Sequence, residues 1–365
     1  MTLRLAGRTV PSGLAPPDVT RLASLGGLDR LGFQVWQAVR PLGRSLSCHM
    51  GKGMDEAQAI ASALGEAREC ADCEAYLSVR VRCRWTALPA DERTASPDDF
   101  AVRRGAIQGD DVLDWTCIES LAGPCLWVPS DTIAIDFTKP RHPAVVRSTT
   151  GQATGNSFPQ AMRRALLERI ERDAVARHRA LRPGARRAWA IDPDTVPFDW
   201  FQTFLTRARR LRMSVGIDQL PAIGELPAYQ LTITEADKPG AACRYTGGWS
   251  AAFTTSAALQ AAMLEAVQSR VGYIAGARDD IDLEPSPPVD PPDWLLASAS
   301  RRFIVAGEEP ADDEAAIQAL SSLLAAAHFP RIGFVGTSAA DSSYVTVKCF
   351  VPGLAQGECA ALPRC

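Results

Sequence analysis

The sequence predicts an α/β (α+β) fold with mixed sheets and helices. Two observations predict it. Helical stretches alternate with β-rich runs from residue 46 to about residue 285. The composition is that of a globular protein, because a chain of 365 residues that is 46% hydrophobic and 22% charged can bury a large core.

The chain divides into two regions at about residue 45. Residues 1–45 are expected to form an N-terminal arm, irregular at first and then a short strand or helix, and residues 46–365 to form one large domain. Within this domain, strands are predicted in the β-rich runs "LWVPSDTIAIDF" (126–137) and "AYQLTITE" (228–235).

The last third of the chain contains a loop, a helix and a strand. Residues 283–293, "LEPSPPVDPPD", are predicted to form a loop inside the domain, because proline lacks the backbone donor that helices and sheets need. The Ala- and Leu-rich run 312–329 predicts a helix, and 342–352, "SSYVTVKCFVP", predicts a strand.

Charge and hydropathy argue against two classes of partner. The chain has 39 basic and 42 acidic residues, so there is no electrostatic reason to expect nucleic acid or an anionic membrane. The N-terminus has no apolar signal region, and no run of about 18 apolar residues could cross a bilayer. We therefore expect a cytoplasmic protein, with its ten scattered cysteines reduced.

One pattern occurs three times, at intervals of about a hundred residues. The segments are "SALGEARE" (62–69), "RALLERIE" (164–171) and "AAMLEAVQ" (261–268), each with two acidic or amide residues three positions apart. On a helix, residues at this spacing share one face. Glu66 and Glu69 lie on such a face, apart from a face with Arg68 and Asp72 that we expect to be solvated.

Acidic side chains from several helices need a cation if they converge. Carboxylates that point into one cleft repel each other unless a cation lies between them, and hard oxygen ligands suit Mg²⁺. Mg²⁺ commonly accompanies a nucleotide phosphate, yet the sequence has no GxxxxGK[ST] phosphate-binding loop. If the substrate is ATP, metal ions would hold its phosphates, with Lys52 and arginines as counter-charges.

The three helical segments lie within longer blocks that resemble the YcaO superfamily. The blocks are "GKGMDEAQAIASALGEARE", "GQATGNSFPQAMRRALLERIERDA" and "AAMLEAVQSRVGYIAGARDD". The opening "RLASLGGLDRLGFQVWQAVRP", the late "VTVKCFVPGL" and "GARDD" resemble the branch that works with a TfuA partner protein. The resemblance implies a YcaO-like domain over 46–365 whose helical carboxylates line a Mg-ATP cleft.

The resemblance also implies an activity. YcaO enzymes phosphorylate the oxygen of a peptide backbone amide with ATP and then displace the phosphate, which splits one difficult step into two easier ones. The nucleophile is a substrate Cys, Ser or Thr side chain in azoline-forming cyclodehydratases and an external sulfur donor in thioamide-forming members.

The site residues follow block by block, although no catalytic residue is assigned. The expected metal ligands are Glu66, Glu69, Asn156, Gln160, Glu168 and Glu171. The expected nucleotide contacts are Lys52, Ser62, Arg172, Gln268 and Arg270.

Three departures from the family pattern guide the choice of reaction. Gln160 stands where a metal-binding Glu is usual, Cys70 replaces an Arg, and "ALPRC" lacks the Pro-x-Pro-x-Pro tail of azoline formers. The missing tail favours thioamide formation with a TfuA-type partner, whereas Gln160 and Cys70 support a non-catalytic subunit. The alternatives are an azoline-forming cyclodehydratase of a ribosomal peptide pathway and a non-catalytic binding subunit of a modification complex. We further expect a peptide or protein substrate, a TfuA-like or peptide-recognition partner, and a homodimer.

Overall fold

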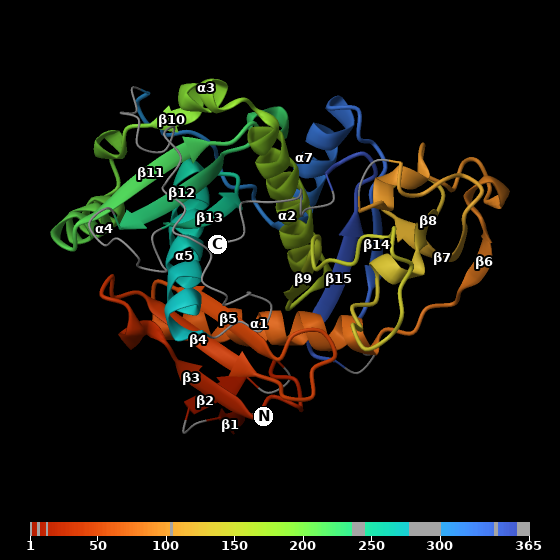
Figure 1. The fold of residues 1–365 in the computed structure, drawn as a ribbon, viewed down its shortest axis with the longest axis horizontal. Helices are drawn as coiled ribbons and strands as arrows, with labels where there is room; N and C mark the ends of the chain where they lie inside the picture. Colours follow the sequence, from red (N-terminus) through yellow and green to blue (C-terminus); the bar gives the residue numbers. More distant parts are fainter. Residues whose placement is uncertain are drawn as a thin grey trace.

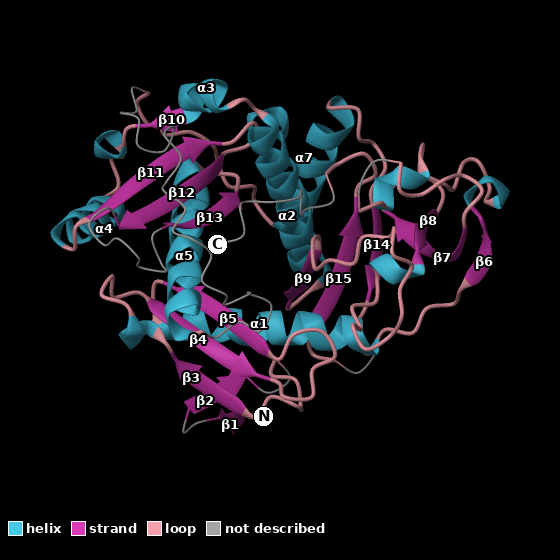
Figure 2. Cartoon of the chain, in the orientation of Figure 1, coloured by secondary structure: helices cyan, strands magenta, loops and turns pink. Residues whose placement is uncertain are grey.

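The computed structural model describes residues 2–5, 8–11, 14–102, 105–235, 245–276, 301–338 and 342–355. The described strands form four sheets, and long helices pack against the larger ones (Figures 1 and 2). The predicted fold class is confirmed. The predicted loop 283–293 and the end of the chain lie outside the described residues. In the described part, no helix is both long and apolar enough to span a membrane.

The N-terminal region forms a three-stranded antiparallel sheet. Its strands are β3 (Arg21–Ser24), β4 (Gln34–Val39) and β5 (Cys48–Gly53), and helix α1 (Glu56–Ala75) packs on β4 and β5. A separate hairpin precedes them, made of β1 (Thr2–Leu5) and β2 (Arg8–Pro11). Strand β4 pairs with β5 along its whole length. The boundary expected at residue 45 thus falls between two paired strands.

The six-stranded sheet carries helix α2 (Phe158–Ala180), and α7 (Asp313–Ala326) packs beside α2. Its strand order is β6-β7-β14-β15-β9, and β8 also pairs with β7. These strands are β6 (Val81–Arg84), β7 (Val112–Ser120), β8 (Leu126–Pro129), β9 (Gln152–Gly155), β14 (Gly333–Gly336) and β15 (Val345–Phe350).

The four-stranded sheet, in the order β10-β11-β12-β13, is covered by helix α5 (Thr255–Ala275). Its strands are β10 (Ala190–Ile191), β11 (Met213–Gln219), β12 (Ala228–Glu235) and β13 (Tyr245–Ala251). Helix α4 (Asp199–Arg210) packs against β11, and the short α3 (Pro183–Arg186) precedes β10. Apolar residues of α4, α5 and the sheet form one core.

The three predicted helices begin in the same way. Each follows a strand and a capping side chain: Asp55 caps α1, Ser157 caps α2 and Thr254 caps α5. These oxygens accept hydrogen bonds from backbone amides of the first turn that would otherwise have no partner. Glycines then let each helix approach its strand. A Cβ on Gly51 would lie 2.1 Å from the Ala63 amide nitrogen of α1.

Three sequence predictions are corrected. In the run 126–137, only Leu126–Pro129 form a strand, because Ser130–Thr132 turn into a 3-10 helix. Asp72, expected on a solvated face, is 7% exposed and accepts a hydrogen bond from Thr346, because α1 also packs against β15. One cysteine pair is not reduced: Cys117 and Cys125, on the β7–β8 hairpin, form a disulfide.

Candidate functional site

Two glutamates from different helices are bound to the same short stretch of backbone. Glu69 of α1 accepts a hydrogen bond from the backbone amide of Thr154 at 2.8 Å. Glu168 of α2 accepts one from the amide of Gly151 at 3.1 Å. Thr154 lies in β9 and Gly151 directly precedes it, between α1 and α2 (Figure 1). Helices far apart in the sequence therefore present carboxylates to one place.

These carboxylates are partly withdrawn from water and close enough to repel each other. Burial raises the pKa of Glu69 well above its usual value, and the charges of Glu66 and Glu168 raise it further, against the Thr154 hydrogen bond. Burial likewise raises the pKa of Glu168, and Arg172 opposes this. For Glu171, burial raises the pKa to about 8, with contributions from Glu265 and Glu168. The site therefore favours a bound cation or proton.

Two cations and a third helix complete the cluster. The Arg172 guanidinium lies 3.5 Å from Glu168 and 3.6 Å from Glu171. Burial disfavours its charge, but the surrounding carboxylates raise its pKa nonetheless. From β5, the Lys52 ammonium reaches Glu265 of α5 at 3.2 Å. The structure thus brings together residues of all three repeated segments.

The two predicted nucleotide contacts on α5 point in different directions. The Gln268 amide donates to the carbonyl of Met50 in β5 at 3.0 Å, and its side-chain oxygen is buried without a hydrogen-bond partner among the described residues. Arg270 instead pairs with Asp29 at 2.9 Å and Glu235 at 2.7 Å. Two residues along a helix correspond to a rotation of about 200°. Arg270 is therefore placed on another face of α5.

The start of α2 holds two predicted metal ligands. The Gln160 side-chain oxygen accepts a hydrogen bond from the backbone amide of Asn156 at 2.8 Å, in an arrangement similar to a capping box. Two helical turns, about 12 Å, separate Gln160 from Glu168, so the two would not bind one ion. Asn156 is exposed, and Ser62 is half-buried one turn before Glu66 on α1.

Comparison with known proteins identifies the family. The model of the family described as "YcaO cyclodehydratase, ATP- and Mg²⁺-binding" matches residues 50–355. The chain belongs to the YcaO family. All three repeated segments lie inside the matched region. ATP and Mg²⁺ are the cofactors that the family description gives.

Among curated proteins, this YcaO chain is similar to an uncharacterized protein in the tfuA 3′ region of Rhizobium leguminosarum bv. trifolii. The two are 31% identical over 270 residues, which cover 72% of this chain and 64% of the relative. An uncharacterized protein of Mycobacterium tuberculosis is 28% identical over 278 residues, covering 73% of this chain and 60% of its own length. The chain thus spans less than two thirds of these relatives.

Solved structures share the fold. A heterocyclase in complex with substrate and cofactor superposes with a TM-score of 0.74 at 18% identity, covering 94% of this chain and 51% of that one. The YcaO protein of Methanopyrus kandleri, bound with AMPPCP and Mg²⁺, gives a TM-score of 0.66 at 19% identity, covering 94% and 86%.

The residues of this YcaO chain fit a Mg²⁺-nucleotide group. Burial and the charge of Glu168 from α2 raise the pKa of Glu69 on α1, and a bound divalent cation would relieve this repulsion. The buried side-chain oxygen of Gln268, which has no hydrogen-bond partner in the described part of the chain, is a further acceptor beside β5. Lys52 and Arg172 are the cations that could face phosphate oxygens.

Sequence reasoning missed one residue beside the carboxylates. Lys348 of β15 is 2% exposed, and its ammonium donates to the carbonyl of Ser148 at 2.6 Å. Burial lowers the pKa of Lys348 to about 8, against the charges of Cys73 and Glu168 nearby. A lysine inside the apolar run "VTVKCFV" is the signal that could have revealed it.

Proposed function

We propose that this chain uses ATP and Mg²⁺ to activate a backbone amide of a peptide or protein, and that the product is a thioamide formed with a TfuA-type partner. The observation that carries the proposal is the convergence of carboxylates from α1 and α2 on the backbone of residues 151–154, next to Arg172. Burial and the charges of Glu66 and Glu168 raise the pKa of Glu69, so the ionised carboxylate is costly in the free protein, and a bound cation would offset that cost.

Each part of the site has a role in this proposal. Glu66, Glu69, Glu168 and Glu171 would hold Mg²⁺, which when bound would neutralise the charge of the transferring phosphoryl group. Lys52 and Arg172 would orient the phosphates, and Gln268 would contact the nucleotide through its buried side-chain oxygen. The remaining predicted contacts, Ser62 and Asn156, stay proposals. Gln160 and Arg270 stay proposals too, although Gln160 accepts a hydrogen bond from the Asn156 amide and Arg270 pairs with Asp29 and Glu235.

The proposed reaction needs neither an oxidant nor a reductant. The amide oxygen attacks the γ-phosphorus of ATP, and ADP leaves. A sulfur nucleophile then adds to the amide carbon, the carbon–oxygen bond breaks, and phosphate departs with the electron pair while the proton from sulfur passes to a base. A phosphate leaves far more readily than an amide oxygen, so phosphorylation activates the amide. The protein's part is to position the reactants and to stabilise the charge that develops.

The choice of a sulfur nucleophile rests on a relative. The Rhizobium protein of the tfuA 3′ region is 31% identical over 270 residues. This similarity favours thioamide formation with a TfuA-type partner over azoline formation. A second candidate, a non-catalytic binding subunit, is favoured by one observation: Gln160 replaces a charged ligand and serves as a helix cap. A cytoplasmic location and a homodimer remain predictions.

Mass spectrometry distinguishes these functions. The chain, a TfuA-type protein, a candidate peptide, ATP, Mg²⁺ and sulfide are incubated together, with omission of each component as a control. Exchange of one oxygen for sulfur in the peptide, with release of ADP, is expected. Loss of one water would indicate azoline formation, and ATP binding without hydrolysis in the complete mixture would indicate the non-catalytic subunit.

A further inference from the structure

Two cysteines and a glutamate lie together at the β7–β8 hairpin. Cys117 is on β7, and Cys125 directly precedes β8. Glu92 comes from an earlier segment, between β6 and β7. One ligand atom of each residue, two sulfurs and a carboxylate oxygen, lies within 4.8 Å of the other two. We call these three residues the Cys–Glu cluster.

The Cys–Glu cluster is separate from the glutamates of α1 and α2. In the six-stranded sheet, β14 and β15 lie between β7 and β9, the strand beside those glutamates (Figure 1). Neighbouring strands are about 4.8 Å apart, so three steps across the sheet correspond to about 14 Å. Binding at the Cys–Glu cluster would therefore be independent of the proposed function.

Hydrogen bonds hold the groups of the cluster in place. The indole nitrogen of Trp127 donates to the Glu92 carboxylate at 2.8 Å, and the Trp127 backbone amide donates to the Glu92 carbonyl at 2.9 Å. The Arg331 guanidinium donates to the carbonyls of Arg93 and Cys125. Hydrogen bonds that orient a carboxylate in this way are typical of metal sites. The glutamate is thus positioned beside the sulfurs before any ion binds.

The cysteine pair has two redox states. Cys117 and Cys125 form a disulfide in the structure, with their Cα atoms 6.2 Å apart. Thiolates on a tetrahedral zinc ion, each about 2.3 Å from the metal, have sulfurs about 3.7 Å apart, so rotation of the side chains would allow both arrangements. Cytosolic reductants keep most cysteines as thiols. The thiol state is therefore the relevant one in the cytoplasm, where we expect this chain.

The chemistry of the reduced cluster selects a thiophilic cation. Two thiolates and a carboxylate this close together repel one another unless a cation lies between them. Thiolate sulfur suits zinc, whereas Mg²⁺ takes hard oxygen ligands. Three protein ligands leave the fourth tetrahedral position for water. Cys117 is exposed and the other two residues are half-buried, so an ion could enter from solvent.

We propose that Glu92, Cys117 and Cys125 bind Zn²⁺ when the disulfide is reduced. A dithiol reductant breaks the sulfur–sulfur bond, gives two electrons and two protons to the cysteines, and is itself left as a disulfide. Zinc then displaces the two thiol protons, which pass to solvent. A disulfide oxidant takes the two electrons back, reforms the Cys117–Cys125 bond and releases the ion.

Zinc titration of the full chain tests the proposal. The protein is reduced with a phosphine, which is then removed, and is titrated anaerobically with Zn²⁺ in competition with a chromophoric chelator. Saturating Mg²⁺ is present throughout to occupy the glutamates of α1 and α2. Co²⁺ replaces Zn²⁺ in a parallel titration, because absorption from thiolate to cobalt reports sulfur ligands.

Two variants remove ligands, and two matched variants serve as controls. The test variants are Cys117→Ser and Glu92→Gln, whose amide oxygen can still accept from Trp127. The controls are Cys83→Ser, a free cysteine on the neighbouring strand β6, and Glu308→Gln, an exposed glutamate elsewhere. Glu92→Gln keeps both cysteines, so it reports the carboxylate even if Cys117→Ser disturbs the hairpin.

We expect the reduced wild type to bind zinc and to show thiolate–cobalt absorption. Cys117→Ser should weaken zinc binding by about 100-fold or more, and Glu92→Gln by about tenfold or more, whereas both controls should match the wild type. The reoxidised chain should lose this binding. No binding to the reduced wild type at micromolar zinc, equal binding by either test variant, or equal binding by the oxidised chain would overturn the proposal.

Discussion

At the scale of single residues, charge balance governs the carboxylate cluster. Arg172 pairs with Glu168 and Glu171, and Lys52 pairs with Glu265. Arg164, Arg169 and Lys348 add positive charge near the same group. The cations therefore balance the carboxylates of the cluster, namely Glu66, Glu69, Glu168, Glu171 and Glu265. Burial is the main cause of the raised pKa values of Glu69, Glu168 and Glu171, and repulsion from neighbouring carboxylates adds to it. A bound magnesium ion would relieve this repulsion without a proton.

Glu168→Gln should abolish ATP turnover and leave the fold intact. The amide oxygen can still accept from Gly151, whereas the charge that would bind a cation is lost. We expect turnover to fall on the order of 100-fold or more, and the metal-free variant to be as stable as the wild type or up to about 1 kcal/mol more stable. The control Glu309→Gln removes a carboxylate that pairs with Arg163 on the outer part of α2. A large loss of thermal stability in Glu168→Gln alone would instead make Glu168 a structural ion-pair partner.

The stability of the metal-free protein should fall as pH rises from about 5 to 8. The folded chain holds the Glu171 proton up to a pKa of about 8, whereas the unfolded chain releases it near the usual value of about 4.3. Stabilisation by this proton is therefore present below the pKa of Glu171 in the unfolded chain. It is lost as pH rises toward the pKa of Glu171 in the folded chain, at no more than about 1.4 kcal/mol per pH unit. Urea unfolding at several pH values measures it. Glu171→Gln and saturating Mg²⁺ should each flatten the profile, and a stability that rises with pH would contradict the assignment.

At the scale of elements, the chain repeats one unit: a strand, a capping side chain and a helix with paired polar residues. The units are β5 with α1, β9 with α2, and β13 with α5. Glycines in the strands allow close contact, which sets the distance between each helix and its strand, and the capping side chain sets the residue at which the helix begins. Together they place the polar pair of each helix toward the common site.

Two glycine substitutions separate contact from helix propensity in the first unit. Gly51→Ala would bring a Cβ to 2.1 Å from the Ala63 amide nitrogen, so α1 must move away from β5. We expect a loss of about 2 kcal/mol or more and weaker Mg²⁺-ATP binding. Gly65→Ala, on α1 with open space around it, should instead stabilise by about 0.5 to 1 kcal/mol. Chemical denaturation of both variants measures this, and equal effects would show that the close contact does not limit packing.

The start of α2 allows a test of Gln160. Gln160→Glu keeps an oxygen acceptor for the Asn156 amide and adds a negative charge at a helix N-terminus, which is favourable. Stability should be unchanged or slightly higher, and Mg²⁺-ATP should bind several-fold more tightly if Gln160 faces the metal. Isothermal titration decides this. Unchanged affinity would restrict Gln160 to its capping role.

At the scale of the whole molecule, the N-terminal strands support helix α1, which carries Glu66 and Glu69. Residues Leu22, Trp36 and Ala38 share a core with Leu64 of α1. A chain that begins at residue 46 would lose β3 and β4 and expose this core, so we expect it to be insoluble or to melt well below the full chain. Removal of 1–13, whose described strands pair only with each other, should cost much less. Circular dichroism melting compares the two, and a native-like melt with nucleotide binding for 46–365 would support an independent N-terminal arm.

The sequence by itself determined the local units. The spacing of Glu66 with Glu69 and of Glu168 with Glu171, the cap at Ser157 and the strand at 228–235 all depend on neighbours within a few positions, and the structure agrees with each. Local periodicity and capping are properties of short segments, so they can be read before the fold is known. The recurrence of the unit was enough to predict that three helices serve one site.

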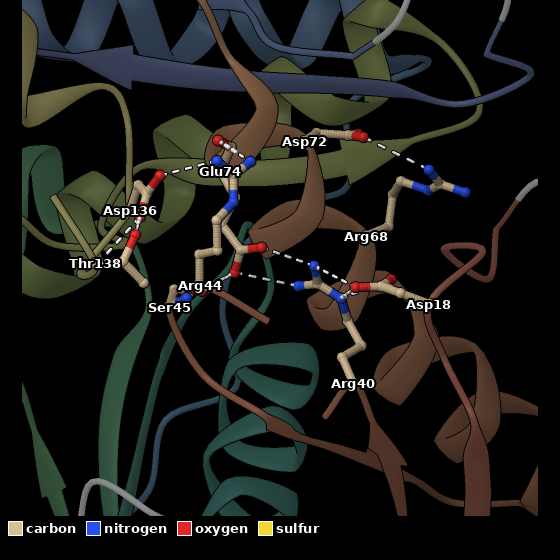
Figure 3. Close-up of polar contacts among 9 residues, drawn as sticks. All are labelled: Asp18, Arg40, Arg44, Ser45, Arg68, Asp72, Glu74, Asp136 and Thr138. Carbon is tan, nitrogen blue, oxygen red and sulfur yellow. Dashed lines mark hydrogen bonds and ion pairs between the residues drawn. The ribbon is translucent and has the colours of Figure 1, made fainter. Parts of the chain in front are cut away.

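Only the tertiary structure decided which side chains are buried and with whom they pair. It placed Arg270 against Asp29 and Glu235, buried Asp72 under β15, and left Lys348 inside the molecule next to the cluster. It also paired Arg44 with Asp136, which lies 92 positions further along the chain (Figure 3). The physical reason is that burial and electrostatic energy are sums over neighbours in space, and most of those neighbours come from distant parts of the chain.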